Sequence, residues 1–120
     1  MSATASHHLQ VPRDVAGNLA FRGYVLLRCK HDRKFRKLIV KMCREDILFF
    51  INTFVWQFNP NAIGQGSTEN GPFITWMVQE EAVEEILYCI RHRKDLVIEK
   101  SREMGASWLC LIVMTWFIMF

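Results

Sequence analysis

The part of this sequence that most constrains its fold is residues 95–120, which read DLVIEKSREMGASWLCLIVMTWFIMF. A short apolar run at residues 96–98 is followed by a polar turn that contains a glycine, and then by an apolar run from Trp108 onward. The first run is typical of a buried parallel strand and the last of a buried helix. A strand, a turn and a helix in this order can build a phosphate site, because N–H groups at the helix start point at the anion and the helix dipole favours its charge.

The composition is that of one small folded domain. The chain has 120 residues, and 51% of them are apolar, which is enough to bury a core and argues against disorder. The net charge is only +3, but residues 28–44 hold eight Lys and Arg against one acid, Asp32. The four cysteines form no CxxC pair and no finger-like set with histidines, so we expect reduced thiols and no zinc site. The start has no secretory signal pattern, which favours a cytoplasmic location.

Helical periodicity is clearest in the middle of the chain. From Asp32, apolar residues at 35, 38, 39, 42 and 43 form one stripe. Lys34, Lys37, Lys41 and Arg44 share another face, which is either solvated or a surface for nucleic-acid phosphates. Asp46 can cap a second helix over about residues 47–56, which is apolar nearly all round and must be buried.

The rest of the chain is predicted to contain a loop and two more helices. Residues 59–72 read as a loop, and residues 79–94 as a helix with its acids first and its bases last, as the helix dipole favours. These acids are explained by structure, so we assign no catalytic pair. The apolar run of residues 108–120 is shorter than the roughly 20 residues of a membrane span. It therefore favours a core helix and no membrane association, with a tail anchor as the alternative.

Residues 100–107 match the phosphate-loop pattern G-x-x-x-x-G-K-[ST] only in part. Aligned on Gly105 and Ser107, the sequence has Lys100 at the first glycine and Ala106 at the lysine. Lys100 at the loop start could still supply the cation that the phosphates need, Arg102 a second one, and Ser107 the hydroxyl for magnesium. The alternative is an ordinary polar turn with exposed basic side chains.

Three segments resemble the large terminase subunits of phages, the motors that pump DNA into capsids. KSREMGAS, within DLVIEKSREMGASWL, resembles their variant Walker A loop, which can carry its lysine at the first position, as Lys100 is placed here. Residues 72–87, PFITWMVQEEAVEEIL, resemble the adenine-contacting segment, with Gln79 at the glutamine position. Residues 44–60, REDILFFINTFVWQFNP, resemble the helical lead-in to the ATPase core. The three matches occur in the order that the family has.

The resemblance implies an α/β fold in which a helical lead-in precedes the start of a P-loop NTPase domain, with its first strand, its P-loop and its first helix. We accordingly divide the chain into a loose arm at residues 1–31, the lead-in at residues 32–71, and the beginning of the ATPase domain at residues 72–120. The implied cofactors are ATP and Mg²⁺, with Ser107 as the magnesium ligand. The residues expected to contact the nucleotide are Gln79, Lys100, Ser101, Arg102, Glu103, Met104, Gly105, Ala106 and Ser107.

The same resemblance implies that the partners are double-stranded DNA, the small terminase subunit and the capsid portal, in the host cytoplasm. No apolar strand ending in Asp-Glu follows the loop, so the magnesium-holding acid, the catalytic glutamate and the nuclease cluster are missing. We therefore interpret the chain as the N-terminal fragment of such a motor, inactive alone, and assign no catalytic residue. The alternative is a small helical protein that binds nucleic acid or another partner, with residues 28–44 as the contact surface.

Overall fold

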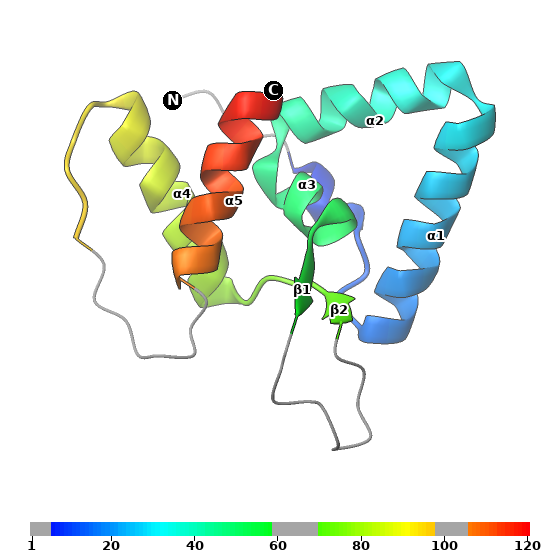
Figure 1. Ribbon diagram of the computed structural model, residues 1–120, viewed down its shortest axis with the longest axis horizontal. Helices are drawn as coiled ribbons and strands as arrows, with labels where there is room; N and C mark the ends of the chain where they lie inside the picture. Colours follow the sequence, from blue (N-terminus) through cyan, green and yellow to red (C-terminus); the bar gives the residue numbers. More distant parts are fainter. Residues whose placement is uncertain (1–5, 59–69, 98–105) are drawn as a thin grey trace. The chain divides into compact units, whose positions relative to one another are not determined.

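The computed structural model describes residues 6–58, 70–97 and 106–120 (Figure 1). Within these ranges the chain forms five α-helices, one short 3-10 helix and a sheet of two strands. It separates into two compact units, Met1–Ile74 and Thr75–Phe120. We describe each unit by itself.

The predicted α/β fold is wrong for the described part of the chain, which is mostly helical. Its two strands pair only with each other, in antiparallel fashion. The apolar run at residues 96–98 was predicted to be a buried parallel strand, but Leu96 and Val97 lie in irregular chain and the side chain of Val97 is 88% exposed. A parallel strand needs a neighbour for its N–H and C=O groups and cover on both faces. No described segment supplies these, so the start of a P-loop NTPase domain is not present there.

Each α-helix of the first unit begins directly after an aspartate that caps it. These helices are α1 (Val15–His31), α2 (Arg33–Glu45) and α3 (Ile47–Phe54). A carboxylate of Asp14 accepts the N–H of Gly17 at 2.7 Å, and one of Asp32 accepts the N–H of Phe35 at 3.1 Å. Asp46 accepts the N–H groups of the second and third residues of α3. Each cap satisfies a donor that has no acceptor inside its helix. The predicted helices from Asp32 and after Asp46 are confirmed.

Helix α1 occupies residues that we had expected to be part of a loose arm. Its buried residues are Asn18, Arg22 and Val25, of which two are polar. The Asn18 amide donates to the carbonyl oxygens of Pro12 and Asn52, both at 2.9 Å. Polar contacts hold α1 in place, so the helix does not need the apolar stripe by which an amphipathic helix is recognised. Without that stripe, its sequence did not reveal it.

Helix α3 forms the centre of the first unit. Its residues 47–53 are all buried, as expected for a helix that is apolar nearly all round. It contacts α1, α2, β2 and the 3-10 helix η1 (His7–Gln10). From α2, Ile39 and Cys43 are also buried. The core of this unit is therefore built around one short helix, with the longer α1 and α2 beside it (Figure 1).

A short hairpin follows α3 where we had predicted two more helical residues and a loop. Strand β1 (Trp56–Phe58) pairs with β2 (Asn70–Pro72), with Gln57 opposite Gly71. The N–H of Phe73 donates to the carbonyl of Val55 at 3.0 Å and continues the pairing. Strands of three residues are too short to show an alternating pattern in the sequence, which is why the pattern did not reveal them.

The second unit contains α4 (Met77–Arg91) and α5 (Ala106–Met119), which lie side by side (Figure 1). Each helix buries a stripe with helical spacing, and the buried residues are Val83, Ile86, Leu87 and Cys89 in α4 and Leu109, Ile112, Val113 and Trp116 in α5. Both helices were predicted, although each starts about two residues earlier than expected. Among the described helices, none has the length and apolar character needed to cross a membrane.

Candidate functional site

The predicted phosphate loop lies mostly outside the described residues. This applies to Lys100, Ser101, Arg102, Glu103, Met104 and Gly105. Its last two residues, Ala106 and Ser107, are the first two residues of α5. The first N–H groups of a helix have no acceptor within it, and they are the groups through which helices bind phosphate. The helix that the sequence predicted after this segment is present, and it begins at Ala106, so Ala106 and Ser107 are helical where the predicted loop included them.

Gln79 has a structural role that the sequence analysis did not predict. It lies in the first turn of α4, where its Oε1 accepts the backbone N–H of Trp76 at 2.9 Å. One residue further, Glu80 Oε1 accepts the hydroxyl of Thr75, also at 2.9 Å. These two contacts stabilise the start of α4. The glutamine at this position, three residues after the N-cap, could have indicated the capping contact. The predicted contact of Gln79 with adenine stays a prediction.

Metal-ligating side chains do not gather in the described part of the protein. No group of three or more His, Cys, Asp or Glu residues there is arranged to hold a metal ion. The predicted magnesium ligand, Ser107, is described only through its place in α5. A magnesium ion held chiefly by phosphate oxygens and water needs only one or two protein ligands, so a single hydroxyl is compatible with the proposed cofactor.

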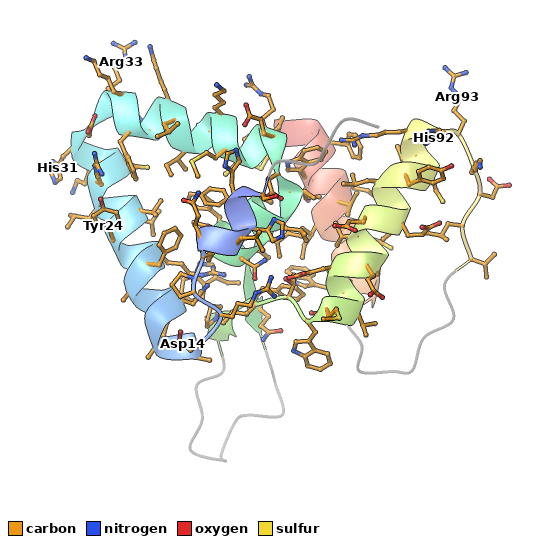
Figure 2. The ribbon with its side chains drawn as sticks, turned by 180° about the vertical axis from the view of Figure 1, so that it is seen from behind. Asp14, Tyr24, His31, Arg33, His92 and Arg93 are labelled. Carbon is orange, nitrogen blue, oxygen red and sulfur yellow. The ribbon has the colours of Figure 1, made fainter. Side chains whose placement is uncertain are left out.

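The most extensive charged feature is on α2, on the side away from the core. Successive helical residues turn by about 100°, which places five basic residues within about 100° of one another. We call these residues the basic face: Arg33, Lys34, Lys37, Lys41 and Arg44. All five are exposed. Figure 2 shows Arg33 at the corner between α1 and α2, close to His31 and with its side chain directed outward.

Little of the charge on the basic face is neutralised. Lys41 Nζ lies 3.8 Å from Glu45 Oε1, and both side chains are exposed. The other four members have no ion-pair partner among the described residues. Glu45 is shared between Lys41 and His7, whose ring nitrogen lies 2.9 Å from the carboxylate. The hydrogen bond with His7, with a smaller contribution from Lys41, lowers the pKa of this carboxyl. The basic face therefore carries a strong local positive potential.

The corner between α1 and α2 fixes where α2 begins. Arg28 donates to the Tyr24 hydroxyl at 2.7 Å and lies over the Phe35 ring, 4.2 Å from its centroid. Arg28 also lies 3.8 Å from Asp32, the residue that ends α1 and caps α2. Four side chains thus meet at one turn, and α2 presents its basic face from a defined position within this unit.

Cysteine chemistry does not supply a nucleophile in α2. Cys43 is buried, and burial, with smaller contributions from Cys29 and Asp46, raises the pKa of its thiol to about 12. Because the thiolate is the reactive form of cysteine, Cys43 is inert near neutral pH. The folded pKa lies above the ordinary value of 9.0, so the folded chain keeps a proton that the unfolded chain releases. The contribution of Cys43 to stability is therefore complete below pH 9 and is lost as the pH rises toward about 12.

We expect Cys43 to resist alkylation in the folded protein. Iodoacetamide at mildly alkaline pH should leave Cys43 unmodified, while the half-buried Cys110 reacts, as read from the mass of each cysteine peptide. After unfolding in guanidinium both should react. Modification of Cys43 in the native protein at the rate seen in the unfolded chain would contradict its burial.

The comparisons with known proteins leave the family of this chain open. No family model, no curated protein and no solved structure matches it.

Proposed function

We propose that this chain is an ATP-binding segment of a terminase-like motor that packages viral DNA into capsids. The observation that carries the proposal is the ordered set of three sequence matches, at residues 44–60, 72–87 and 100–107. We assign binding and not hydrolysis to this chain, because no residue in it matches the magnesium-holding acid or the catalytic glutamate. The proposal concerns the loop and its ligands and does not require an α/β domain within the described residues.

The roles of the residues follow from their chemistry. Lys100 and Arg102 would pair with phosphate oxygens, and Gly105 would let the backbone approach them closely. Ser107 would ligate Mg²⁺, and Gln79 would contact the adenine. Two features of the second unit support these roles: α5 begins at Ala106, directly after the loop, and Gln79 lies in the first turn of α4, the helix beside α5. By the same resemblance, double-stranded DNA, the small terminase subunit and the capsid portal would be partners in the host cytoplasm.

A calorimetric titration of the whole chain with ATP, in the presence and absence of Mg²⁺, tests the proposal. Lys100→Ala should weaken ATP binding about 10- to 100-fold, since a hydrogen bond to a charged group contributes about 1.5–3 kcal/mol. Ser107→Ala should remove the gain in affinity that Mg²⁺ gives and leave metal-free binding unchanged.

Lys30→Ala is the matched control, because it removes one exposed lysine from α1, in the other unit. It should leave ATP binding unchanged. Absence of ATP binding by the wild-type chain, or equal affinities for Lys100→Ala and Lys30→Ala, would rule out the assigned site.

A further inference from the structure

We infer that the basic face of α2 binds the sugar–phosphate backbone of duplex DNA without regard to sequence. This inference rests on the unit Met1–Ile74, whereas the proposed nucleotide site lies in Thr75–Phe120. The proposed function names double-stranded DNA as a partner but assigns no residue to it, whereas this inference is argued from α2. ATP binding and DNA binding can each fail alone.

The spacing of the basic face fits the spacing of phosphates. At 1.5 Å of rise per residue, the distance along α2 from Arg33 to Arg44 is about 16 Å, which gives one cation for about every 4 Å of helix axis. One strand of duplex DNA presents a phosphate about every 3.4 Å along its axis. The five cations also lie on one side of the helix, so they can face the same duplex together.

The charge of the basic face is available to a ligand. Four of its members have no acidic partner in the described part of the chain. The fifth, Lys41, shares only the exposed contact with Glu45 at 3.8 Å. Exposed pairs of this kind contribute about 0–1 kcal/mol, so a phosphate can replace the carboxylate at little cost. Because all five side chains are exposed, we expect their replacement to change the stability of the fold little.

The other side of α2 decides between nucleic acid and a membrane. An amphipathic helix that binds a lipid surface must insert its apolar side into the bilayer. Here Ile39 and Cys43 on that side are buried in the core, and Asp32 and Asp46 hold the two ends of the helix. The apolar side of α2 is therefore not free to insert.

The residue types on the basic face decide between DNA and a protein partner. Protein interfaces depend on buried aromatic or apolar anchors at their centre, and this face consists of Lys and Arg alone. The exposed apolar residues of α2, Leu38 and Val40, lie singly at its two edges. Lys and Arg can contact phosphates or guanine, whereas Asn and Gln, which read adenine, are absent from the face. Contacts to phosphates carry no sequence information, so binding should not depend on the DNA sequence.

The test measures binding of the 120-residue chain to two labelled DNA duplexes of unrelated sequence, by fluorescence anisotropy between about 50 and 200 mM salt. We expect similar affinities for the two duplexes. With five phosphate contacts, the logarithm of the binding constant should fall with the logarithm of the salt concentration with a slope of about −4.5.

The triple variant Lys34→Gln, Lys37→Gln, Arg44→Gln removes three charges that have no ion-pair partner among the described residues. Its slope should be smaller by about 2.7, and its affinity near 0.1 M salt should be lower on the order of 100-fold. The matched control, Arg91→Gln, Arg93→Gln, Lys94→Gln, removes three exposed charges from the other unit. It should keep the wild-type slope. Circular dichroism of both variants should show unchanged helix content.

Three results would overturn the inference. The first is an equal loss of affinity and slope in the two triple variants, which would show a general charge effect. The second is strong preference for one duplex sequence. The third is binding to phosphatidylserine vesicles or to polyglutamate that needs Lys34, Lys37 and Arg44 while duplex DNA is not bound, which would assign the face to a membrane or to an acidic protein.

Discussion

Replacing Arg22 with alanine should lower the free energy of unfolding by roughly 3–5 kcal/mol, because five hydrogen bonds from one buried, charged donor are lost. The Arg22 side chain is 1% exposed and has no carboxylate partner among the described residues. It donates to Asn18 Oδ1 at 2.6 Å and to the carbonyl oxygens of Val55 at 2.7 Å, Asn52 at 3.0 Å, Phe73 at 3.1 Å and Ile51 at 3.4 Å.

These acceptors explain why the effect is expected to be large. Ile51 and Asn52 lie in the last turn of α3, whose carbonyl oxygens have no donor within the helix. Arg22 supplies an additional donor from α1, besides the N–H of Val55 for the Ile51 carbonyl and the amide of Asn18 for the Asn52 carbonyl. Its positive charge is also favoured at the C-terminal end of the α3 dipole. The same guanidinium binds Phe73, just after β2. One side chain thus joins α1, α3 and the hairpin.

Burial also affects the protonation of Arg22. Loss of solvent lowers the pKa of this guanidinium from its ordinary, higher value to about 10. Arg22 is therefore protonated at neutral pH, and all of its hydrogen bonds are made by the charged form. Between these two pKa values the unfolded chain binds more protons than the folded chain, so the contribution of Arg22 makes stability rise with pH there. Below about pH 9 it adds no pH dependence.

Urea unfolding followed by circular dichroism measures the effect of Arg22→Ala. Arg22→Lys should lose less, since its ammonium keeps the charge but has only three donors and cannot reproduce the planar fork. Arg36→Ala removes an exposed arginine of α2 and should change stability by less than about 0.5 kcal/mol. If Arg22→Ala is as stable as Arg36→Ala, the buried arginine does not hold this unit together.

Local signals account for what the sequence predicted well. The helices from Asp32, after Asp46, around residues 79–94 and from Trp108 all have a cap, an apolar stripe or an ordered charge pattern within their own residues. The exposed cations of α2 followed from the same spacing. That four of them lack acidic neighbours could only be seen in the structure, because it depends on which acids the fold brings near.

Contacts between distant residues account for what the sequence predicted poorly. Helix α1 is held by the hydrogen bonds of Asn18 and Arg22. Apart from the contact of Asn18 with Pro12 and the one between Asn18 and Arg22, their partners are about thirty or more residues away in the sequence. The apolar run at residues 96–98 has the composition of a strand, but a strand forms only with a neighbour to pair with. A short apolar run in the sequence does not show whether such a neighbour is present.

Asp46→Ala should lower the free energy of unfolding by roughly 2–4 kcal/mol, because it removes a helix cap and leaves buried donors unpaired. The carboxylate is fully buried. One oxygen accepts the N–H groups of Leu48 at 3.0 Å and Phe49 at 3.4 Å, which start α3. The other oxygen accepts the N–H of His8 at 2.9 Å and contacts His8 Nδ1 at 2.7 Å. Asp46 therefore joins η1 to the central helix as well as capping it.

Asp14→Ala separates these two roles, since Asp14 caps α1 from an exposed position, where its carboxylate accepts the N–H of Gly17. Loss of that cap alone should cost about 1 kcal/mol. A double-mutant cycle with His8→Ala then isolates the contact of the His8 imidazole with Asp46, since the variant keeps the backbone N–H of His8, and we expect a coupling energy of about 1 kcal/mol or more. If Asp46→Ala costs no more than Asp14→Ala and the cycle gives no coupling, Asp46 is only a cap, and the attachment of η1 to α3 must rest on other contacts, such as the His7 ring, which meets the edge of Phe49 with 6.3 Å between centroids.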